Sequence, residues 1–177
     1  MKIILQTKRL YAAVPSMESL ENRAKLLCNR EVSRFLGNGM PKSRGEVKEF
    51  LQKNIDHYDE HGFCLFDIYE KDSNQFIGDA GLIHEALNPQ NPNVEVGYRL
   101  LKEFWGKGYA TELTQAFIDV GFEEFKLDKI FAFCKAENVA SANVMRKSGM
   151  KQNGKYLYGG KSECDSSVIL AKKNYRA

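Results

Sequence analysis

The sequence predicts a single α+β domain over residues 1–177, built on one mixed, mostly antiparallel sheet of about seven strands with four flanking helices. Two observations support this prediction. Segments with strand and helix periodicity follow one another in the order β-α-α-β-β-β-α-β-α-β-β, which combines hairpins with helical connections. The chain of 177 residues is long enough for one core but short for two, and it shows no internal repeat.

The N-terminal elements are marked by breaks in the pattern. A strand is predicted over Gln6–Val14, and a helix over Met17–Cys28, because Pro15 and Ser16 end the strand and supply an N-cap. Residues 29–40 have no regular pattern. The second helix begins near Ser43 and has a core-facing stripe made of Val47, Phe50, Leu51, Asn54, Ile55 and Tyr58.

The remaining elements alternate strands with two helices. The fourth strand contains Gly97, which predicts a bulge or the close approach of another backbone. Gly149 is expected to end the last helix in the left-handed conformation. The predicted strands are Phe63–Glu70, Phe76–His84, Val94–Leu101, Lys129–Lys135, Met150–Tyr158 and Glu163–Ala171, with a turn at Gly159-Gly160, and the helices are Tyr109–Phe125 and Asn138–Lys147.

Composition narrows the class of protein. Lys and Arg number 26 against 23 Asp and Glu, and the resulting charge of +3 is too small to predict a nucleic-acid partner. The four cysteines form no CxxC pair, so neither a zinc knuckle nor a redox dithiol is expected. The N-terminus lacks a signal-peptide pattern and no stretch is long enough to span a membrane, so we expect a cytoplasmic protein.

A glycine turn at residues 104–111 joins the fourth strand to the long helix. The first N–H groups of a helix have no intrahelical partner, and Gly106 and Gly108 let a ligand approach them closely. The helix dipole favours an anion at the same place, and Lys107 can add a positive charge. Neither the Walker pattern nor the dinucleotide pattern is present, although both bind phosphates at a similar turn.

The sequence WGKGYATE at residues 105–112 resembles the pyrophosphate loop of the GNAT acetyltransferase superfamily, in particular its ribosomal-protein-alanine N-acetyltransferase branch. In that motif, Gln or Arg is followed by two residues, Gly, one residue, and Gly or Ala. Gly108 and Ala110 fill the last two positions, whereas Trp105 replaces Gln or Arg and removes one side-chain donor. Residues 136–150 resemble a second GNAT segment, which starts at an Asn and closes with Lys-x-Gly-Phe; Met150 replaces the Phe.

The resemblance implies a GNAT fold in which the fourth and fifth strands splay apart, and acetyl-CoA as co-substrate in the gap. It implies that backbone groups of Tyr98 and Leu100 bind the pantetheine arm from one side. The loop around the pyrophosphate would consist of Gly106, Lys107, Gly108, Tyr109, Ala110 and Thr111. Asn138 and Asn143 would bind the arm from the other side, and Lys147 would reach the phosphates. Asn138 has an alternative role as the N-cap of its helix.

The resemblance also implies catalysis by direct attack of a primary amine on acetyl-CoA in a ternary complex. The candidate base is Glu95, whose alternative is an ordinary solvent-facing strand glutamate. The backbone N–H near Tyr98 would polarise the thioester carbonyl. Many relatives use a tyrosine to protonate the leaving thiolate, but Met145 stands at that position. Ser141 is the substitute candidate, with a capping or packing hydroxyl as its alternative role.

Several alternatives follow from the same residues. The absent tyrosine leaves open a non-catalytic acyl-CoA-binding module, or an enzyme for longer acyl groups. Cys134 could carry a covalent acyl group but is more typical of a core residue. His57 and His61 lie four apart in HYDEH, which is not a zincin motif, so no metal is expected. The expected partner is an amine acceptor, either a protein N-terminus or a small molecule, and the protein is expected to be a monomer or homodimer.

Overall fold

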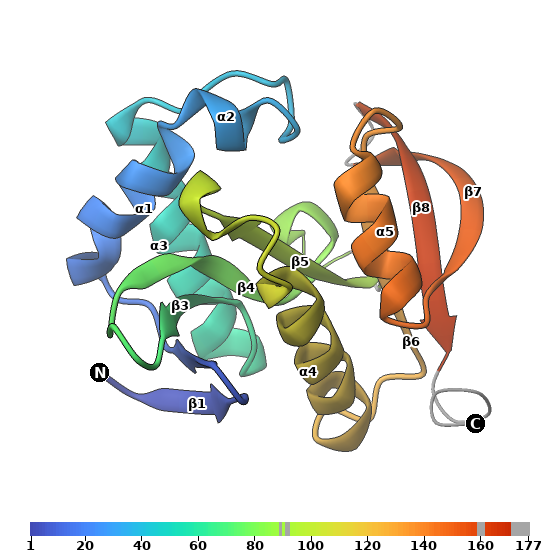
Figure 1. The fold of residues 1–177 in the computed structure, drawn as a ribbon, viewed down its shortest axis with the longest axis horizontal. Coiled ribbons are helices and arrows are strands. Elements are labelled where there is room, and N and C mark those ends of the chain that lie inside the picture. Colours follow the sequence, from blue (N-terminus) through green and yellow to red (C-terminus); the bar gives the residue numbers. More distant parts are fainter. Residues whose placement is uncertain (89, 91–92, 159–161, 171–177) are drawn as a thin grey trace.

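The computed structural model describes residues 1–88, 90, 93–158 and 162–170. These residues form one open sheet of eight strands in the order β1-β2-β3-β4-β5-β6-β8-β7, with five α-helices (Figure 1). The strands are β1 Ile3–Gln6, β2 Leu10–Ala13, β3 Leu65–Glu70, β4 Phe76–His84, β5 Val94–Leu100, β6 Lys129–Cys134, β7 Lys151–Tyr158 and β8 Ser162–Leu170. The helices are α1 Leu20–Leu27, α2 Arg30–Ser33, α3 Arg44–His61, α4 Tyr109–Glu123 and α5 Val139–Lys147. The predicted α+β class is confirmed.

Helices cover both faces of the sheet (Figure 1). Successive residues of a strand point to opposite faces. On β3, Asp67 binds Arg23 of α1, whereas the neighbouring Phe66 stacks on Phe117 of α4 with ring centroids 5.8 Å apart. The guanidinium of Arg99 on β5 lies over the ring of Phe50 in α3. Helices α1 and α3 therefore lie on one face, and α4 lies on the other.

Strands β5 and β6 are parallel and separate soon after they begin. Their register contains a single Cα pair, Glu95 with Phe131, whereas the β4–β5 register is continuous from His84–Val94 to Gly78–Leu100. The C-terminal halves of β5 and β6 are therefore unpaired with each other over the described residues. This separation is the splaying that the family resemblance implied.

Two predicted N-terminal segments are wrong. Of the predicted strand Gln6–Val14, only Leu10–Ala13 forms β2, and Gln6 is instead the last residue of β1. A turn separates the two strands, because Thr7 accepts from the Leu10 N–H through its hydroxyl (3.1 Å) and donates its own N–H to the Leu10 carbonyl (2.9 Å). The irregular segment 29–40 contains the single-turn helix α2, capped by Asn29, which accepts from the Glu31 N–H at 2.9 Å. Four residues are too few to show helical periodicity.

The remaining predictions concern single glycines, the start of α3 and the C-terminal turn. The bulge at Gly97 is wrong, since the β4–β5 register passes through it unshifted and a Cβ there would meet only a Leu65 methyl at 3.7 Å. Gly149 has φ +80°, so the predicted left-handed helix end is confirmed. Ser43 caps α3 in a capping box with Glu46. The predicted turn at Gly159-Gly160 and the strand end at Ala171 lie outside the described residues.

A buried ion network fixes α1 to the sheet and leads to a prediction for stability. The fully buried Arg23 donates to Asp67 at 2.7 Å and to Asp79, and Asp79 also receives two bonds of 2.7 Å from Arg99. Removing one partner leaves buried charge uncompensated, so Asp79→Asn should lower the free energy of unfolding by about 3 kcal/mol. Urea denaturation checks this value. A loss below about 1 kcal/mol would contradict the assigned role.

Candidate active site

The loop between β5 and α4 presents a set of unpaired main-chain donors. Gly106 and Gly108 have φ angles of +75° and +81°, which L side chains rarely adopt, and Gly108 is the N-cap of α4. Within the described part of the chain, no acceptor pairs with the backbone N–H groups of residues 106–111. The helix dipole adds positive potential at the same point. This loop can therefore bind a phosphate group.

Arg9 holds the loop from a distant part of the chain. Its Nη1 donates to the Lys107 carbonyl at 2.8 Å, and its Nε donates to Glu112 in the first turn of α4 at 2.7 Å. The Arg9 N–H and the Thr7 hydroxyl also donate to Glu112, at 2.9 and 2.6 Å. Arg9 thus positions the donors without lining the cavity beside them. Sequence reasoning missed it because the contact spans about a hundred residues.

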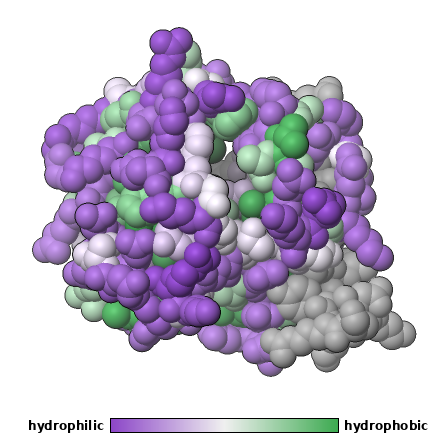
Figure 2. All heavy atoms as spheres, in the orientation of Figure 1, coloured by the Kyte–Doolittle hydropathy of each residue, from purple (hydrophilic) through white to green (hydrophobic). Residues whose placement is uncertain are grey.

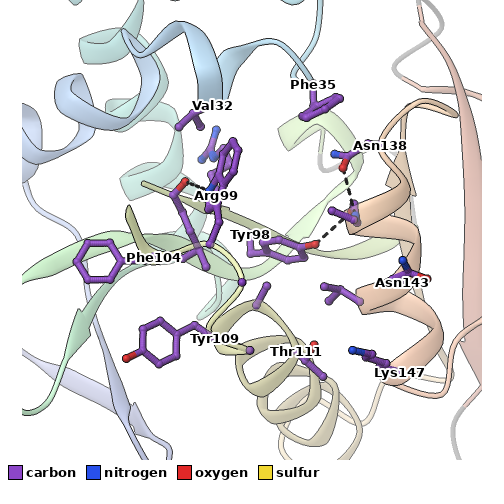
Figure 3. Close-up of a pocket in the computed structure, with 18 of the residues that line it drawn as sticks. Val32, Phe35, Tyr98, Arg99, Phe104, Tyr109, Thr111, Asn138, Asn143 and Lys147 are labelled. Atoms are coloured by element: carbon purple, nitrogen blue, oxygen red, sulfur yellow. Dashed lines mark hydrogen bonds between the residues drawn. The ribbon is translucent and has the colours of Figure 1, made fainter. Parts of the chain in front are cut away.

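The donors open onto a cavity of about 310 Å³ between β5 and α5 (Figure 3). Figure 2 shows the surface hollowed in the same place. The predicted co-substrate residues that line the cavity are Tyr98, Leu100, Gly106, Gly108, Tyr109, Ala110, Thr111, Asn138, Asn143 and Lys147. Lys107 does not line it, since its ammonium lies over the Phe104 ring, 4.8 Å from the centroid. Val32 and Phe35 also line the cavity, and sequence reasoning gave no co-substrate role to either residue.

Main-chain groups on the edge of β5 face this cavity. The Leu101 N–H donates to Ile77 of β4 at 2.9 Å, so by alternation the main-chain groups of Leu100 and Tyr98 point the other way, toward β6. The indole N–H of Trp105 donates to the Leu100 carbonyl at 2.7 Å. The residue that replaces Gln or Arg of the motif therefore directs its donor at its own backbone.

Helix α5 forms the other wall with polar side chains (Figure 3). Asn138 does cap the helix, because its Oδ1 accepts from the Ser141 N–H at 3.1 Å. This bond uses the oxygen and leaves the side-chain amide nitrogen as a donor. Asn143 accepts from Arg146 at 3.3 Å, and Lys147 contributes a cation at the same wall. The cavity is therefore lined by donors on both sides of the gap.

A second, larger cavity of about 720 Å³ lies between α3 and the sheet. Glu95 lines it and is 6% exposed, and the Tyr158 hydroxyl donates to Glu95 Oε1. Glu95 is therefore a buried, hydrogen-bonded carboxylate, not a solvent-facing one. The two cavities meet at the gap between β5 and β6, where both are lined by Phe35, Leu36, Tyr98, Arg99 and Ser141.

Two hydroxyl groups stand at this junction. The Tyr98 phenol donates to Ser141 Oγ at 3.3 Å (Figure 3), and burial raises the pKa of Tyr98 above its usual value. Tyr98 is thus protonated near neutral pH, and Ser141 keeps its own proton to donate. The sequence pointed to the backbone of Tyr98 and gave no signal for its side chain.

The remaining candidate nucleophile is unsuited to covalent catalysis. Cys134 lines the larger cavity, but burial raises the pKa of its thiol, so it carries little thiolate at neutral pH. Among the aromatic candidates for the acceptor pocket, Phe35 and Tyr158 line the larger cavity and Trp105 lines the smaller one. Tyr156 instead packs on Phe133 and donates to Glu85 at 2.7 Å.

Comparisons with known proteins agree with this geometry. Residues 10–151 match the family model described as acetyltransferase (GNAT) domain. An uncharacterized N-acetyltransferase, YoaA of Bacillus subtilis (strain 168), is 27% identical over 173 residues, covering 96% of this chain and 97% of its own. No helix among the described residues has the length and apolar character needed to cross a membrane.

Two solved structures that contain coenzyme A share the fold. RimL, a ribosomal L7/L12 alpha-N-protein acetyltransferase, has a TM-score of 0.76 at 19% identity and covers 96% of this chain and 98% of its own. The aminoglycoside acetyltransferase AAC(6')-Ib has a TM-score of 0.75 at 13% identity and covers 92% and 95%. The chain belongs to the GNAT acetyltransferase family and is an acetyl-CoA-dependent N-acetyltransferase.

Proposed function

We propose that this enzyme transfers the acetyl group directly to a primary amine while both substrates are bound. The proposal rests on the meeting of the two cavities at the gap between β5 and β6, where Tyr98 and Ser141 line both of them. Acetyl-CoA occupies the smaller cavity, with its diphosphate at residues 106–111 and its thioester in the gap. The acceptor occupies the larger cavity and attacks through the gap, so no acyl-enzyme forms.

Glu95 is proposed as the general base. Its carboxylate lines the acceptor cavity and removes the proton from the incoming ammonium, directly or through water. The amine nitrogen then bonds to the carbonyl carbon, and the Tyr98 backbone N–H stabilises the charge on the oxygen. A chain N-terminus, with an ordinary pKa of about 7.7–8.0, needs less help from Glu95 than a lysine side chain near 10.4.

Ser141 is proposed as the acid for the leaving thiolate. When the carbon–sulfur bond breaks, the Ser141 hydroxyl gives its proton to the sulfur while Oγ accepts from Tyr98, and the proton that the new amide nitrogen loses returns to Ser141, directly or through water. Ser141→Ala should lower kcat by roughly 10²-fold with an unchanged Kd for CoA, because a positioned acid contributes at least that much. Tyr98→Phe should cause a smaller loss, since it leaves the Ser141 proton in place. Wild-type turnover by Ser141→Ala would remove Ser141 from the mechanism.

The acceptor is proposed to be a protein N-terminus or a small amine. RimL acts on a protein N-terminus and AAC(6')-Ib is an aminoglycoside acetyltransferase, so this fold serves both classes. The larger cavity is lined by the carboxylates of Asp56, Glu60 and Glu95 and by the ammonium groups of Lys42 and Lys53. This mixed lining suits an acceptor that carries both positive and negative groups. The sequence likeness to ribosomal-protein acetyltransferases favours the peptide class.

An acceptor panel tests the proposal. Release of CoA thiol is followed with peptides of varied N-terminus, polyamines and aminoglycosides, using acetyl-CoA and longer acyl-CoA esters. We expect turnover with at least one class and with acetyl-CoA as the preferred donor. Binding of CoA without turnover on any amine would instead support the non-catalytic acyl-CoA-binding module.

A further inference from the structure

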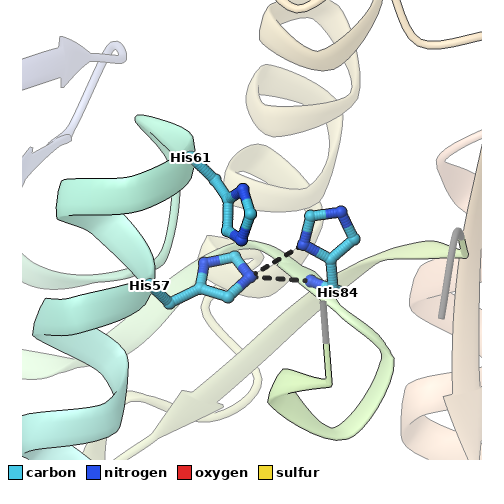
Figure 4. Close-up of side chains that lie close together, drawn as sticks. All are labelled: His57, His61 and His84. Carbon is cyan, nitrogen blue, oxygen red and sulfur yellow. Dashed lines mark hydrogen bonds between the residues drawn. The ribbon is translucent and has the colours of Figure 1, made fainter. Parts of the chain in front are cut away.

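All three histidines of the chain meet at one place outside the proposed transfer chemistry (Figure 4). His57 and His61 lie one turn apart near the end of α3, and His84 is the last residue of β4. One ring nitrogen from each lies within 4.8 Å of the others. The spacing of His57 and His61 gave only two potential ligands, and the fold supplies the third.

Hydrogen bonds fix which nitrogen of His57 faces the cluster. His57 Nδ1 lies 2.8 Å from the Phe63 carbonyl, and a carbonyl only accepts, so Nδ1 carries the hydrogen. The lone pair is therefore on Nε2, which lies 3.0 Å from His84 Nδ1 and accepts from the His84 backbone N–H at 3.3 Å. A ring N–H bound to a backbone carbonyl is the usual support of a metal-binding histidine.

The imidazole of His61 has one ring nitrogen without a hydrogen-bond partner among the described residues. This atom, Nε2, is buried. The nearest carboxylate oxygen, Glu60 Oε2, is 3.6 Å away, beyond hydrogen-bond reach. A buried polar atom without a partner is rare in folded proteins and requires an explanation, such as an ion that occupies the site.

We propose that His57 Nε2, His61 Nε2 and His84 Nδ1 bind one divalent transition-metal ion, with Zn²⁺ as the expected ion. Three imidazoles are a typical zinc ligand set, and the fourth position is open to solvent or to Glu60. Zn–N bonds of about 2.0–2.1 Å place tetrahedral ligands about 3.4 Å apart. Side-chain rotations must therefore shorten the longest separation, at most 4.8 Å, by up to about 1.4 Å, whereas His57 Nε2 and His84 Nδ1, at 3.0 Å, must move slightly apart. The metal would join the end of α3 to the end of β4.

The surroundings of the three histidines favour the binding of Zn²⁺. Burial lowers the pKa of both His57 and His84, so both rings are neutral and able to coordinate at neutral pH. The ring of Phe63 packs against all three imidazoles and limits solvent access. His57 and Glu60 also line the larger cavity, so the ion would stiffen one wall of the acceptor site. The inference goes beyond the proposed function and does not depend on it.

Metal binding by protein that carries no histidine tag tests the proposal. After treatment with EDTA, the protein is titrated with Zn²⁺ by calorimetry, and bound metal is measured by mass spectrometry. We expect one Zn²⁺ per chain, a raised Tm with Zn²⁺ but not Mg²⁺, and tetrahedral d–d absorption bands with Co²⁺. His61→Gln should weaken Zn²⁺ binding by more than about 100-fold. Loss of a ligand should cost more affinity than the roughly 10- to 100-fold loss caused by mutating residues that only hold the ligands in place.

Control variants separate the cluster from other ligands. Cys28→Ser removes the exposed thiol and should bind Zn²⁺ like wild type. His84→Gln provides a second ligand deletion if His61→Gln does not fold, and circular dichroism with CoA affinity reports the integrity of each. The proposal is overturned if wild type shows no saturable Zn²⁺ binding, or if both ligand deletions bind Zn²⁺ as tightly as wild type.

Discussion

Replacing Thr111 with glutamate is expected to weaken CoA binding by at least about 100-fold while the protein stays as stable as wild type. Thr111 is the third residue of α4 and lines the smaller cavity (Figure 3). A carboxylate there repels the diphosphate and competes for the same N–H groups, and juxtaposed like charges cost several kcal/mol. The same carboxylate interacts favourably with the helix dipole, so stability is maintained. Calorimetric CoA titration and thermal unfolding measure the two effects.

The matched control is Gln115→Glu, which adds the same charge to the same helix one turn later. Gln115 is exposed and does not line either cavity. We expect its CoA affinity to stay within a few-fold of wild type, because the added carboxylate is exposed and lies outside the cavity, although the change removes the 3.2 Å bond from the Gln115 amide to the Lys147 carbonyl. Equal affinities of Thr111→Glu and Gln115→Glu for CoA would show that the start of α4 does not contact the diphosphate.

The second large effect is expected from Glu95→Gln, which should lower kcat by about 10²–10⁴-fold. The amide cannot take up a proton, but its oxygen still accepts from Tyr158, so the local packing is preserved. The Kd for CoA should not change, because Glu95 lines the larger cavity and not the smaller one beside residues 106–111. Steady-state kinetics over a pH series should show that the residual activity rises with pH as the free amine becomes available.

Tyr158→Phe distinguishes a base from a structural carboxylate. It removes the hydroxyl that donates to Glu95 and leaves the carboxylate in place. We expect a loss of kcat smaller than that of Glu95→Gln. If Glu95→Gln turns over like wild type, or if the two variants lose the same activity, Glu95 does not act as the base.

The glycine loop between β5 and α4 was predictable because its information is local. Gly106 and Gly108 mark a strand-to-helix turn in the sequence itself, and the structure places both at positive φ angles. The order of the central elements was predictable for the same reason. The long periodic segment that became α4 was predicted to within two residues at both ends, and the start of α3 to within one residue.

Contacts between distant segments could not be predicted. The bond from Arg9 to the Lys107 carbonyl, the pairing of Tyr98 with Ser141 and the meeting of His84 with the α3 histidines depend on how the sheet and helices pack. At Gly97 the error is of the opposite kind, because a local sequence feature gave a prediction that the structure contradicts. The lack of a side chain at Gly97 suggested a bulge, but the strand is regular and the glycine lies beside the larger cavity.

The proposed mechanism requires that the backbone N–H groups of residues 106–111 bind the CoA diphosphate while the pantetheine arm lies between β5 and β6. A crystal structure of the enzyme with CoA tests it most directly. We expect diphosphate oxygens within hydrogen-bond distance of several of these N–H groups, and an arm that extends past Tyr98 toward Ser141. Coenzyme A bound elsewhere, or β5 and β6 paired along their length with the loop donors engaged by the protein, would contradict it.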